Sequence, residues 1–201
     1  MSSVEIEVKF AVADPADLAR RLQQAGFHEE TPRTFERNVL YDTPDRRLRS
    51  QQAILRVRNY GGKWTITHKC LTRDNDPAAR HKHRQETETT VADGDAIGEI
   101  FTQLGYAPAF AYEKWRTEYA DATGHCVLDE TPIGVYAELE GPADWIDETG
   151  RKLGVDHAEF LTLSYGRLFD RWREQTGSRA ENLTFAEISA SAASFSGPSL
   201  R

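Results

Sequence analysis

The chain has 201 residues, 39% of them hydrophobic and 28% charged, which is enough for one domain of ordinary size with a sizeable core. Its 32 acidic and 25 basic side chains give a net charge of −7, which argues against a general nucleic-acid-binding protein. Because no apolar run could span a bilayer and no room is left for a signal peptide, we expect a cytoplasmic protein with no membrane partner.

The first predicted element is a strand at residues 5–10, EIEVKF, in which charged and apolar side chains alternate. Alternation places the charged side chains on one face of a strand and the apolar ones on the other. A helix is predicted next, at residues 14–27, where Asp14 can cap the first turn and Pro15 suits the first helical position. Gly26 is then expected to end this helix.

Similar patterns continue along the chain. Alternating runs predict further strands at residues 35–42, 53–60, 63–69, 84–91, 111–121, 125–130 and 135–141. Helical spacing predicts helices at residues 94–106, 142–154 and 163–175, and a polar segment predicts a loop at 71–83. About eight strands with a few inserted helices indicate an α+β domain dominated by antiparallel strands. We assign this domain to residues 1–176 and expect the Ser- and Ala-rich residues 177–201 to be a poorly ordered tail.

Strand after strand carries long ionisable side chains on one face. These faces contain Glu5, Glu7 and Lys9, then Arg56 and Arg58, Arg84, Glu86 and Glu88, Lys114 and Arg116, and Glu138 and Glu140. Lys69 ends one strand, and Asp129 precedes the last one. For a single strand this pattern is typical of a solvated face. For the whole set, it predicts either a flat mixed-charge surface or a closed barrel with a polar interior and helices packed outside.

Charges enclosed in such an interior must be neutralised, because uncompensated charges are costly away from bulk water. Carboxylates near both ends of the chain could bind Mg²⁺ or Mn²⁺, which favour oxygen ligands. The lysines and arginines could bind a highly anionic ligand, since arginine side chains match phosphate oxygens. A divalent metal together with a polyphosphate would satisfy both sets of charges.

The segment EIEVK resembles the ExExK signature of the CYTH domain, the triphosphate tunnel metalloenzyme superfamily. The resemblance continues in the family's order through YDTPD, LRVR, WTITHK, RQETE, EKWR, LDETPIGVYAELEG and SYGRLF. It therefore covers nearly all of residues 4–170. This superfamily includes class IV adenylyl cyclases, thiamine triphosphatases and inorganic triphosphatases.

The resemblance implies a closed antiparallel eight-stranded β-barrel, a tunnel with helices packed outside, that binds a triphosphate together with Mg²⁺ or Mn²⁺. The implied metal ligands are Glu5, Glu7, Asp129, Glu138 and Glu140. The implied phosphate contacts are Lys9, Arg56, Arg58, Lys69 and Arg116, with Arg84 and Lys114 as companions. Glu86 and Glu88 would bind a second metal or pair with arginines of the tunnel. No catalytic residue is assigned, and the oligomeric state is left open between monomer and homodimer.

One position departs from the family pattern. Many relatives carry a lysine before the tyrosine of the final SY-containing segment, whereas this chain has Leu163 there. The phosphate contact or water-activating lysine of those relatives is therefore not carried over to this position. Tyr165 remains, and we expect it to be a packing residue of a helix.

Hydrolysis of a triphosphate is the function that we expect. The substrate would be inorganic triphosphate, thiamine triphosphate or a nucleoside triphosphate. A class IV adenylyl cyclase is the alternative, since attack by the ribose 3′-hydroxyl on the α-phosphorus could occur in the same tunnel. Cyclisation also requires a grip on the adenine, and the sequence offers no residue that we can assign to base recognition. A polyphosphate-binding module without turnover is a third alternative.

Overall fold

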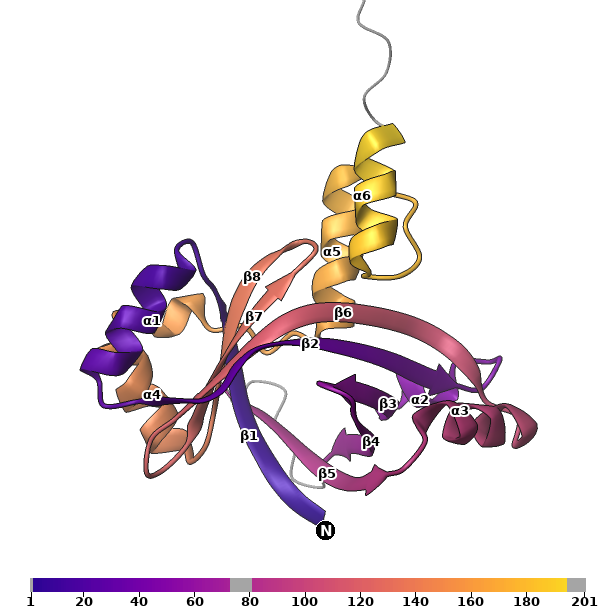
Figure 1. Cartoon of the computed structure of the whole chain (residues 1–201), viewed down its shortest axis with the longest axis horizontal. Coiled ribbons are helices and arrows are strands. Elements are labelled where there is room, and N and C mark those ends of the chain that lie inside the picture. The colour runs from indigo at the N-terminus through magenta and orange to yellow at the C-terminus, as the bar shows by residue number, and fades with distance from the viewer. Residues whose placement is uncertain (1, 73–80, 195–201) are drawn as a thin grey trace, which may run out of the picture.

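The computed structural model describes residues 2–72 and 81–194 (Figure 1). The strands are β1 (Ser2–Ala11), β2 (His28–Asp42), β3 (Ile54–Tyr60), β4 (Lys63–Leu71), β5 (Lys82–Val91), β6 (Ala107–Ala120), β7 (His125–Thr131) and β8 (Gly134–Glu140). The helices are α1 (Pro15–Gln24), α2 (Arg47–Ser50), α3 (Gly94–Gln103), α4 (Ala143–Lys152), α5 (Tyr165–Thr176) and α6 (Phe185–Ser194), with a short 3₁₀ turn, η1, at His157–Glu159. Within the described ranges, no helix combines the length and apolar character needed to cross a membrane.

The eight strands form a closed barrel in the order β1-β5-β4-β3-β2-β6-β7-β8, and every neighbouring pair is antiparallel. The predicted α+β fold, a closed antiparallel eight-stranded barrel with helices outside, is confirmed. β2 begins at His28, earlier than predicted, and β4 and β5 both extend into the predicted loop. The centre of that loop, residues 73–80, lies outside the described residues.

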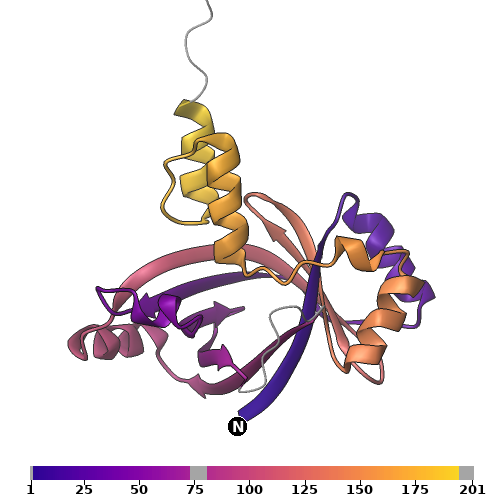
Figure 2. The same cartoon turned by 180° about the vertical axis from the view of Figure 1, so that it is seen from behind.

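Helices α1 and α4 cover one end of the barrel, on the outer faces of β1, β7 and β8 (Figures 1 and 2). Asp14 caps α1 by accepting hydrogen bonds from the backbone N–H groups of Ala16 and Asp17. The apolar face of α1 packs with Val8, which points outward from β1, and the two are buried in one core cluster. Burial of each such aliphatic side chain stabilises the fold by roughly 1.5–3 kcal/mol. Since Val8 and Phe10 point outward beneath the helices, the charged face of β1 points into the barrel.

The expectation of a poorly ordered tail is wrong for residues 178–194. β7 pairs with β6 only from Trp115 onward, which leaves the preceding edge of β6 open. Leu183 pairs with that edge: its carbonyl accepts the N–H of Glu113 at 2.9 Å, and its N–H donates to the carbonyl of Ala111 at 3.0 Å. The Leu183 side chain is 0% exposed and packs with α5 and α6, which rise side by side from the barrel (Figure 2). An unpaired strand edge and a few apolar side chains therefore order a segment whose composition suggested disorder.

Truncating the Leu183 side chain tests this packing. We expect Leu183→Ala to lower the free energy of unfolding by about 2–4 kcal/mol, because it opens a cavity between the segment and the barrel. Urea unfolding followed by circular dichroism would measure the change. The exposed Ser189 on α6 offers a matched control, since Ser189→Ala should change stability by less than about 0.5 kcal/mol. Equal stability of Leu183→Ala and the wild-type protein would contradict the packing.

Candidate active site

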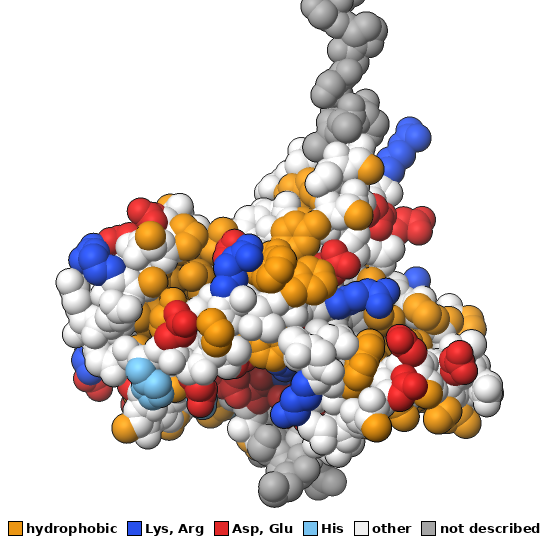
Figure 3. Space-filling view, viewed as in Figure 1, with side chains coloured by type: hydrophobic (Ala, Val, Ile, Leu, Met, Phe, Trp, Pro, Cys, Tyr) orange, Lys and Arg blue, Asp and Glu red, His pale blue; other side chains and the backbone are white. Residues whose placement is uncertain are grey.

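The inward faces of the strands enclose a tunnel cavity of about 380 Å³. Ten of the twelve predicted metal- and phosphate-binding residues line it: Glu5, Glu7, Lys9, Arg56, Arg58, Lys69, Lys114, Arg116, Glu138 and Glu140. The register explains this convergence, because directly paired residues of antiparallel strands project to the same side of the sheet. Glu7 pairs with Glu140, and Lys9 pairs with Glu138. In the space-filling view, acidic side chains gather near the middle of the face with basic side chains beside them (Figure 3).

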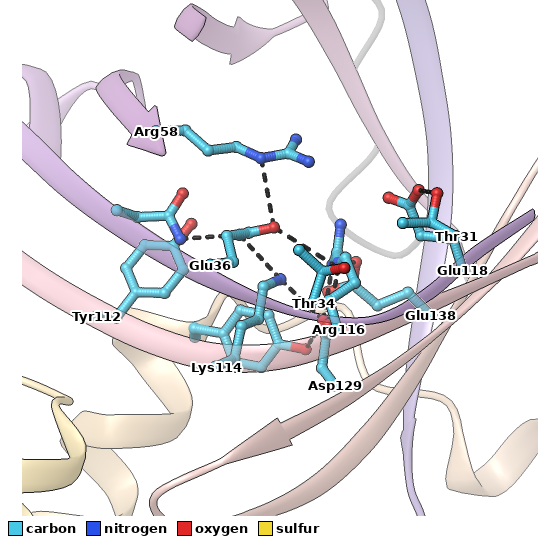
Figure 4. A network of polar contacts seen from close by, with 12 residues as sticks. Thr31, Thr34, Glu36, Arg58, Tyr112, Lys114, Arg116, Glu118, Asp129 and Glu138 are labelled. Carbon is cyan, nitrogen blue, oxygen red and sulfur yellow. Dashed lines mark hydrogen bonds and ion pairs between the residues drawn. The ribbon is translucent and has the colours of Figure 1, made fainter. Parts of the chain in front are cut away.

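Asp129 lies behind the cavity wall and is 0% exposed. Its carboxylate accepts hydrogen bonds from Lys114 at 2.9 Å, from two nitrogens of Arg116 at 2.7 Å each, and from the Tyr165 hydroxyl at 2.6 Å (Figure 4). These contacts occupy both carboxylate oxygens. Asp129 therefore fits the role of positioning Lys114 and Arg116 better than the predicted role of metal ligand.

Glu36 of β2 belongs to the same network, although the sequence analysis missed it. It is 0% exposed and lies 3.4 Å from Lys114 Nζ, 3.3 Å from Arg58 Nε and 3.8 Å from Arg116 Nε (Figure 4). Burial alone would raise the pKa of this carboxyl, but Lys114, Arg116 and Arg58 outweigh burial and hold the pKa far below its ordinary value. The spacing of Glu36 and Asn38, two residues apart in the predicted strand 35–42, was the signal that could have identified it, because such residues share one face of a strand.

Glu138 is likewise paired with cations. It forms ion pairs with Lys9 and, at 3.0 Å, with Arg116. Burial opposes ionisation of Glu138, yet Lys9 and Arg116 lower its pKa well below the ordinary value. Glu138 thus balances two cations of the wall.

Glu5, Glu7 and Glu140 form a second acidic group, on the paired strands β1 and β8. Lys69 Nζ lies 2.6 Å from Glu5, and it is shared with Glu86 at 2.9 Å. Burial, followed by the nearby Glu7, raises the pKa of Glu5. Glu140 is exposed at the end of β8, and partial loss of water contact together with Glu5 and Glu7 raises its pKa to about 7. Burial and repulsion between carboxylates therefore oppose the ionisation of both Glu5 and Glu140.

This donor set fits a hard divalent cation such as Mg²⁺ or Mn²⁺, which takes oxygen ligands and would relieve the repulsion. Among the described residues, no three His, Cys, Asp or Glu side chains are already arranged around a common point that could hold a metal ion. Lys69 lies against Glu5 there, so a metal would have to compete with its ammonium group. Of the five predicted metal ligands, Glu5, Glu7 and Glu140 fit best, because they lie together on the cavity wall, whereas both carboxylate oxygens of Asp129 accept hydrogen bonds and Glu138 pairs with two cations.

The raised pKa of Glu140 predicts a pH-dependent stability. In the unfolded chain this carboxyl ionises near 4.5, whereas in the folded protein it keeps its proton up to about pH 7. The folded state binds more protons in this interval, so the contribution of Glu140 to stability falls as the pH rises. Discounting for solvent exposure, we expect Glu140→Gln to raise Tm by about 2–4 °C at pH 8 without divalent cation, and to leave Tm unchanged at pH 4. Thermal scans at both pH values measure this, and a lower Tm of the variant at pH 8 would contradict it.

Glu86 and Glu88 pair with cations of the tunnel, one of the two roles that were left open. Glu86 lies 2.9 Å from Lys69, and Glu88 lies 3.6 Å from Arg56. The guanidinium groups of Arg56 and Arg58 line the same cavity, and the Nε atom of Arg58 lies 3.3 Å from Glu36. An anionic ligand in the cavity could accept hydrogen bonds from the guanidinium nitrogens that face it.

Tyr165 does more than pack a helix, in contrast to our expectation. Besides donating to Asp129, its ring lies 4.2 Å from Lys9 Nζ and 4.7 Å from Lys114 Nζ, and it lines the tunnel cavity. The start of α5 thereby fixes two ammonium groups of the wall. Leu163, at the position where many relatives have lysine, supplies no cation and lines an adjoining cavity. Arg84 lines that adjoining cavity too, and not the tunnel cavity.

Comparison with known proteins agrees with this geometry. The family model of the CYTH domain matches residues 3–160, well over half of the chain. The chain belongs to the CYTH family. The family resemblance of the sequence motifs is thereby confirmed, and the paired β1 and β8 carry the motif residues of this CYTH protein on the tunnel wall.

Several proteins resemble this CYTH protein. A Methanocaldococcus jannaschii protein named "Putative adenylate cyclase" is 25% identical over 151 residues, which are 75% of this chain and 83% of that protein. A Vibrio parahaemolyticus protein with the same provisional name has a solved structure with a TM-score of 0.73 and 18% identity, covering 85% of this chain and 99% of that one. A Hippeastrum adenylyl cyclase candidate, described as having a dominant triphosphatase activity, has a TM-score of 0.57 and 17% identity, covering 84% and 96% of the two chains.

Proposed function

We propose that this CYTH protein hydrolyses a triphosphate in a reaction that depends on a divalent cation. One observation carries the proposal: a single cavity combines a wall of lysines and arginines with a separate group of carboxylates, in which burial and mutual repulsion raise the pKa of Glu5 and Glu140. A triphosphate would satisfy the cations, and Mg²⁺ or Mn²⁺ would satisfy the carboxylates.

Different residues would bind the phosphate groups and the divalent cation. Lys9, Lys114 and Arg116 are held in place by carboxylates of the wall, so they would meet phosphate oxygens without having to be reordered. Arg56 and Arg58 would donate from the guanidinium groups that line the cavity. Glu5, Glu7 and Glu140 would hold the cation, which when bound neutralises phosphate charge and acidifies water. Positioning and charge neutralisation of this kind account for most of the catalysis in phosphoryl transfer.

In the proposed step, a water oxygen bonds to the terminal phosphorus as the bond from that phosphorus to the bridging oxygen breaks. The rest of the substrate leaves as a diphosphate with the bonding electron pair, and the proton of the attacking water passes to solvent. The products are phosphate and the corresponding diphosphate, which is free for inorganic triphosphate and still joined to the thiamine or nucleoside for the other substrates.

Cyclisation of ATP is the second candidate, favoured by the names of the relatives from Methanocaldococcus jannaschii and Vibrio parahaemolyticus. The ribose 3′-oxygen would attack the α-phosphorus in the same tunnel, releasing diphosphate. The triphosphatase activity described for the Hippeastrum protein supports hydrolysis instead.

A product assay separates these functions. Purified protein is incubated with Mg²⁺ or Mn²⁺ and either inorganic triphosphate, thiamine triphosphate or ATP, with EDTA as the metal-free control. We expect metal-dependent release of phosphate from at least one substrate. Cyclic AMP with diphosphate from ATP would establish the cyclase instead. Binding of triphosphate without any product would indicate a module that has no turnover.

A further inference from the structure

An ordered segment of the chain lies outside the region that the CYTH family model matches. The match ends at residue 160, whereas residues 178–194, here called the C-terminal segment, follow α5 and include α6. The family model therefore assigns this segment no role. Its contacts with the barrel are confined to the part of β6 that β7 leaves unpaired.

The C-terminal segment pairs with β6 on both sides of Tyr112. Asn182 Oδ1 accepts the backbone N–H of Ala111 at 2.9 Å. Leu183 exchanges backbone hydrogen bonds with Ala111 and Glu113, the two chain neighbours of Tyr112. The opposite edge of the same stretch pairs with β2. Tyr112 therefore lies on a length of strand that is hydrogen-bonded along both edges.

The turn that presents Asn182 and Leu183 is itself fixed by α6. The carboxylate of Glu187, in the first turn of α6, accepts the backbone N–H groups of Glu181 and Asn182. The Leu183 side chain is fully buried in the same core cluster as Tyr112. The segment thus restrains Tyr112 through backbone pairing and through side-chain packing.

Tyr112 in turn contacts a residue that would bind phosphate. It lines the tunnel cavity, and its hydroxyl accepts a hydrogen bond from Arg56 Nη1 at 3.3 Å. The other terminal nitrogen of Arg56, Nη2, donates to Thr67 at 3.1 Å and pairs with Glu88 at 3.6 Å. Because each terminal nitrogen has its own partner, the position of Tyr112 helps to set the plane in which the guanidinium meets a phosphate.

We propose that the C-terminal segment is a positioning element of the tunnel, with Leu183 and Asn182 as its positioning residues. By fixing β6 around Tyr112, the segment holds the Tyr112 hydroxyl where it orients Arg56 toward the phosphates. The effect is indirect, since no described residue of the segment lines the tunnel cavity. This inference rests on the proposed function only in that the tunnel binds a triphosphate, and it does not require hydrolysis.

Two leucine truncations separate positioning from stability. Leu153→Ala removes the same atoms as Leu183→Ala from a side chain that is also 0% exposed, but Leu153 belongs to the other core cluster, with α1 and α4. Both variants should lose stability, whereas only Leu183→Ala should bind triphosphate more weakly. Leu183→Met keeps most of the packing volume and should restore binding. Asn182→Ala loosens the same contact without changing the apolar core, so it serves if Leu183→Ala fails to fold.

The test is titration calorimetry with inorganic triphosphate as the probe and Ca²⁺ as the divalent cation, at a temperature where circular dichroism shows each variant folded. We expect Kd to rise about tenfold in Leu183→Ala and at least about threefold in Asn182→Ala, because a misoriented arginine loses much of a charge-assisted hydrogen bond. In Leu153→Ala and Leu183→Met, Kd should stay within about twofold of the wild-type value.

A double-mutant cycle shows whether the effect passes through Tyr112. Tyr112→Phe removes the hydroxyl that Arg56 contacts and should itself raise Kd about tenfold. Adding Leu183→Ala to Tyr112→Phe should then raise Kd by no more than about a further twofold, because changes that act on one shared contact are not additive.

Three outcomes would overturn the inference: an unchanged Kd in both Leu183→Ala and Asn182→Ala, an equal rise in Leu153→Ala, or a rise in the double variant that equals the product of the two single rises. The result is distinguishable from a failure of the proposed function. The expected pattern of Kd values without release of product would leave the positioning role intact and remove the assignment as a hydrolase. Absence of triphosphate binding by the wild-type protein would contradict both.

Discussion

Glu7→Gln is expected to lower kcat/KM for the preferred triphosphate by about 10²–10³-fold, with little change in stability. Glu7 lies in the acidic group with Glu5 and Glu140, and its negative charge helps to raise the pKa of both neighbours. Removing one of these charges weakens the divalent-cation site and also relieves repulsion. We therefore expect Tm to stay the same or to rise slightly while turnover falls.

Steady-state rates across a series of Mg²⁺ or Mn²⁺ concentrations would measure the effect. Glu174→Gln provides the control, because it makes the same chemical change at an exposed position of α5 and should leave the rate unaltered. If Glu7→Gln keeps normal metal-dependent turnover, Glu7 is not a metal ligand.

Asp129→Asn is expected to lower the free energy of unfolding by about 3–5 kcal/mol. The asparagine has nearly the same shape, but it no longer carries the charge that balances Lys114 and Arg116 inside the barrel. Two buried cations would then rely on Glu36 and Glu138 alone. Leaving buried charges uncompensated is far more costly than losing an exposed ion pair.

The neighbouring residue offers a direct comparison. Glu130 points to the outside of the barrel and pairs with Arg33 at 2.7 Å, where both side chains are partly exposed. Glu130→Gln should cost no more than about 1 kcal/mol. Urea unfolding of both variants would measure the difference, and equal losses would mean that Asp129 does not anchor the tunnel wall.

The residues that face the tunnel could be predicted from the sequence. Charged side chains recur at every second residue, and side chains of a strand alternate between its two faces with the same period. Alternation in EIEVKF places Glu5, Glu7 and Lys9 on one face, and the same rule applies to each later strand. Closure of the barrel could not be deduced from alternation alone, since an open sheet would show the same pattern. The ordered motifs of the CYTH family supplied that step.

The pairing of charges could not be predicted in the same way. Whether an acidic residue holds a metal or balances a cation depends on strand register, which brings together residues far apart in the chain. Arg116 lies directly opposite Asp129, and Glu36 lies opposite Lys114. Because the sequence does not reveal that register, Asp129 was predicted to be a metal ligand and Glu36 was not selected as a site residue.

The C-terminal segment shows how composition can mislead. Serine and alanine dominate residues 189–197, yet the ordering contacts come from Leu183 and Ile188 together with an unpaired stretch of β6. An open strand edge is a tertiary feature that no property of the tail itself reveals. Tyr165 was misjudged for a similar reason, because its partners Asp129, Lys9 and Lys114 come from three strands of the barrel.

In the proposed reaction, the tunnel holds a divalent cation beside a triphosphate, at the acidic group of β1 and β8. Anomalous diffraction at the manganese edge, from crystals grown with Mn²⁺ and inorganic triphosphate, tests it most directly. We predict a manganese peak inside the tunnel in contact with Glu5, Glu7 or Glu140, with triphosphate density against Arg56 and Arg58. A peak beside Asp129 instead, or no manganese within the tunnel, would contradict the account.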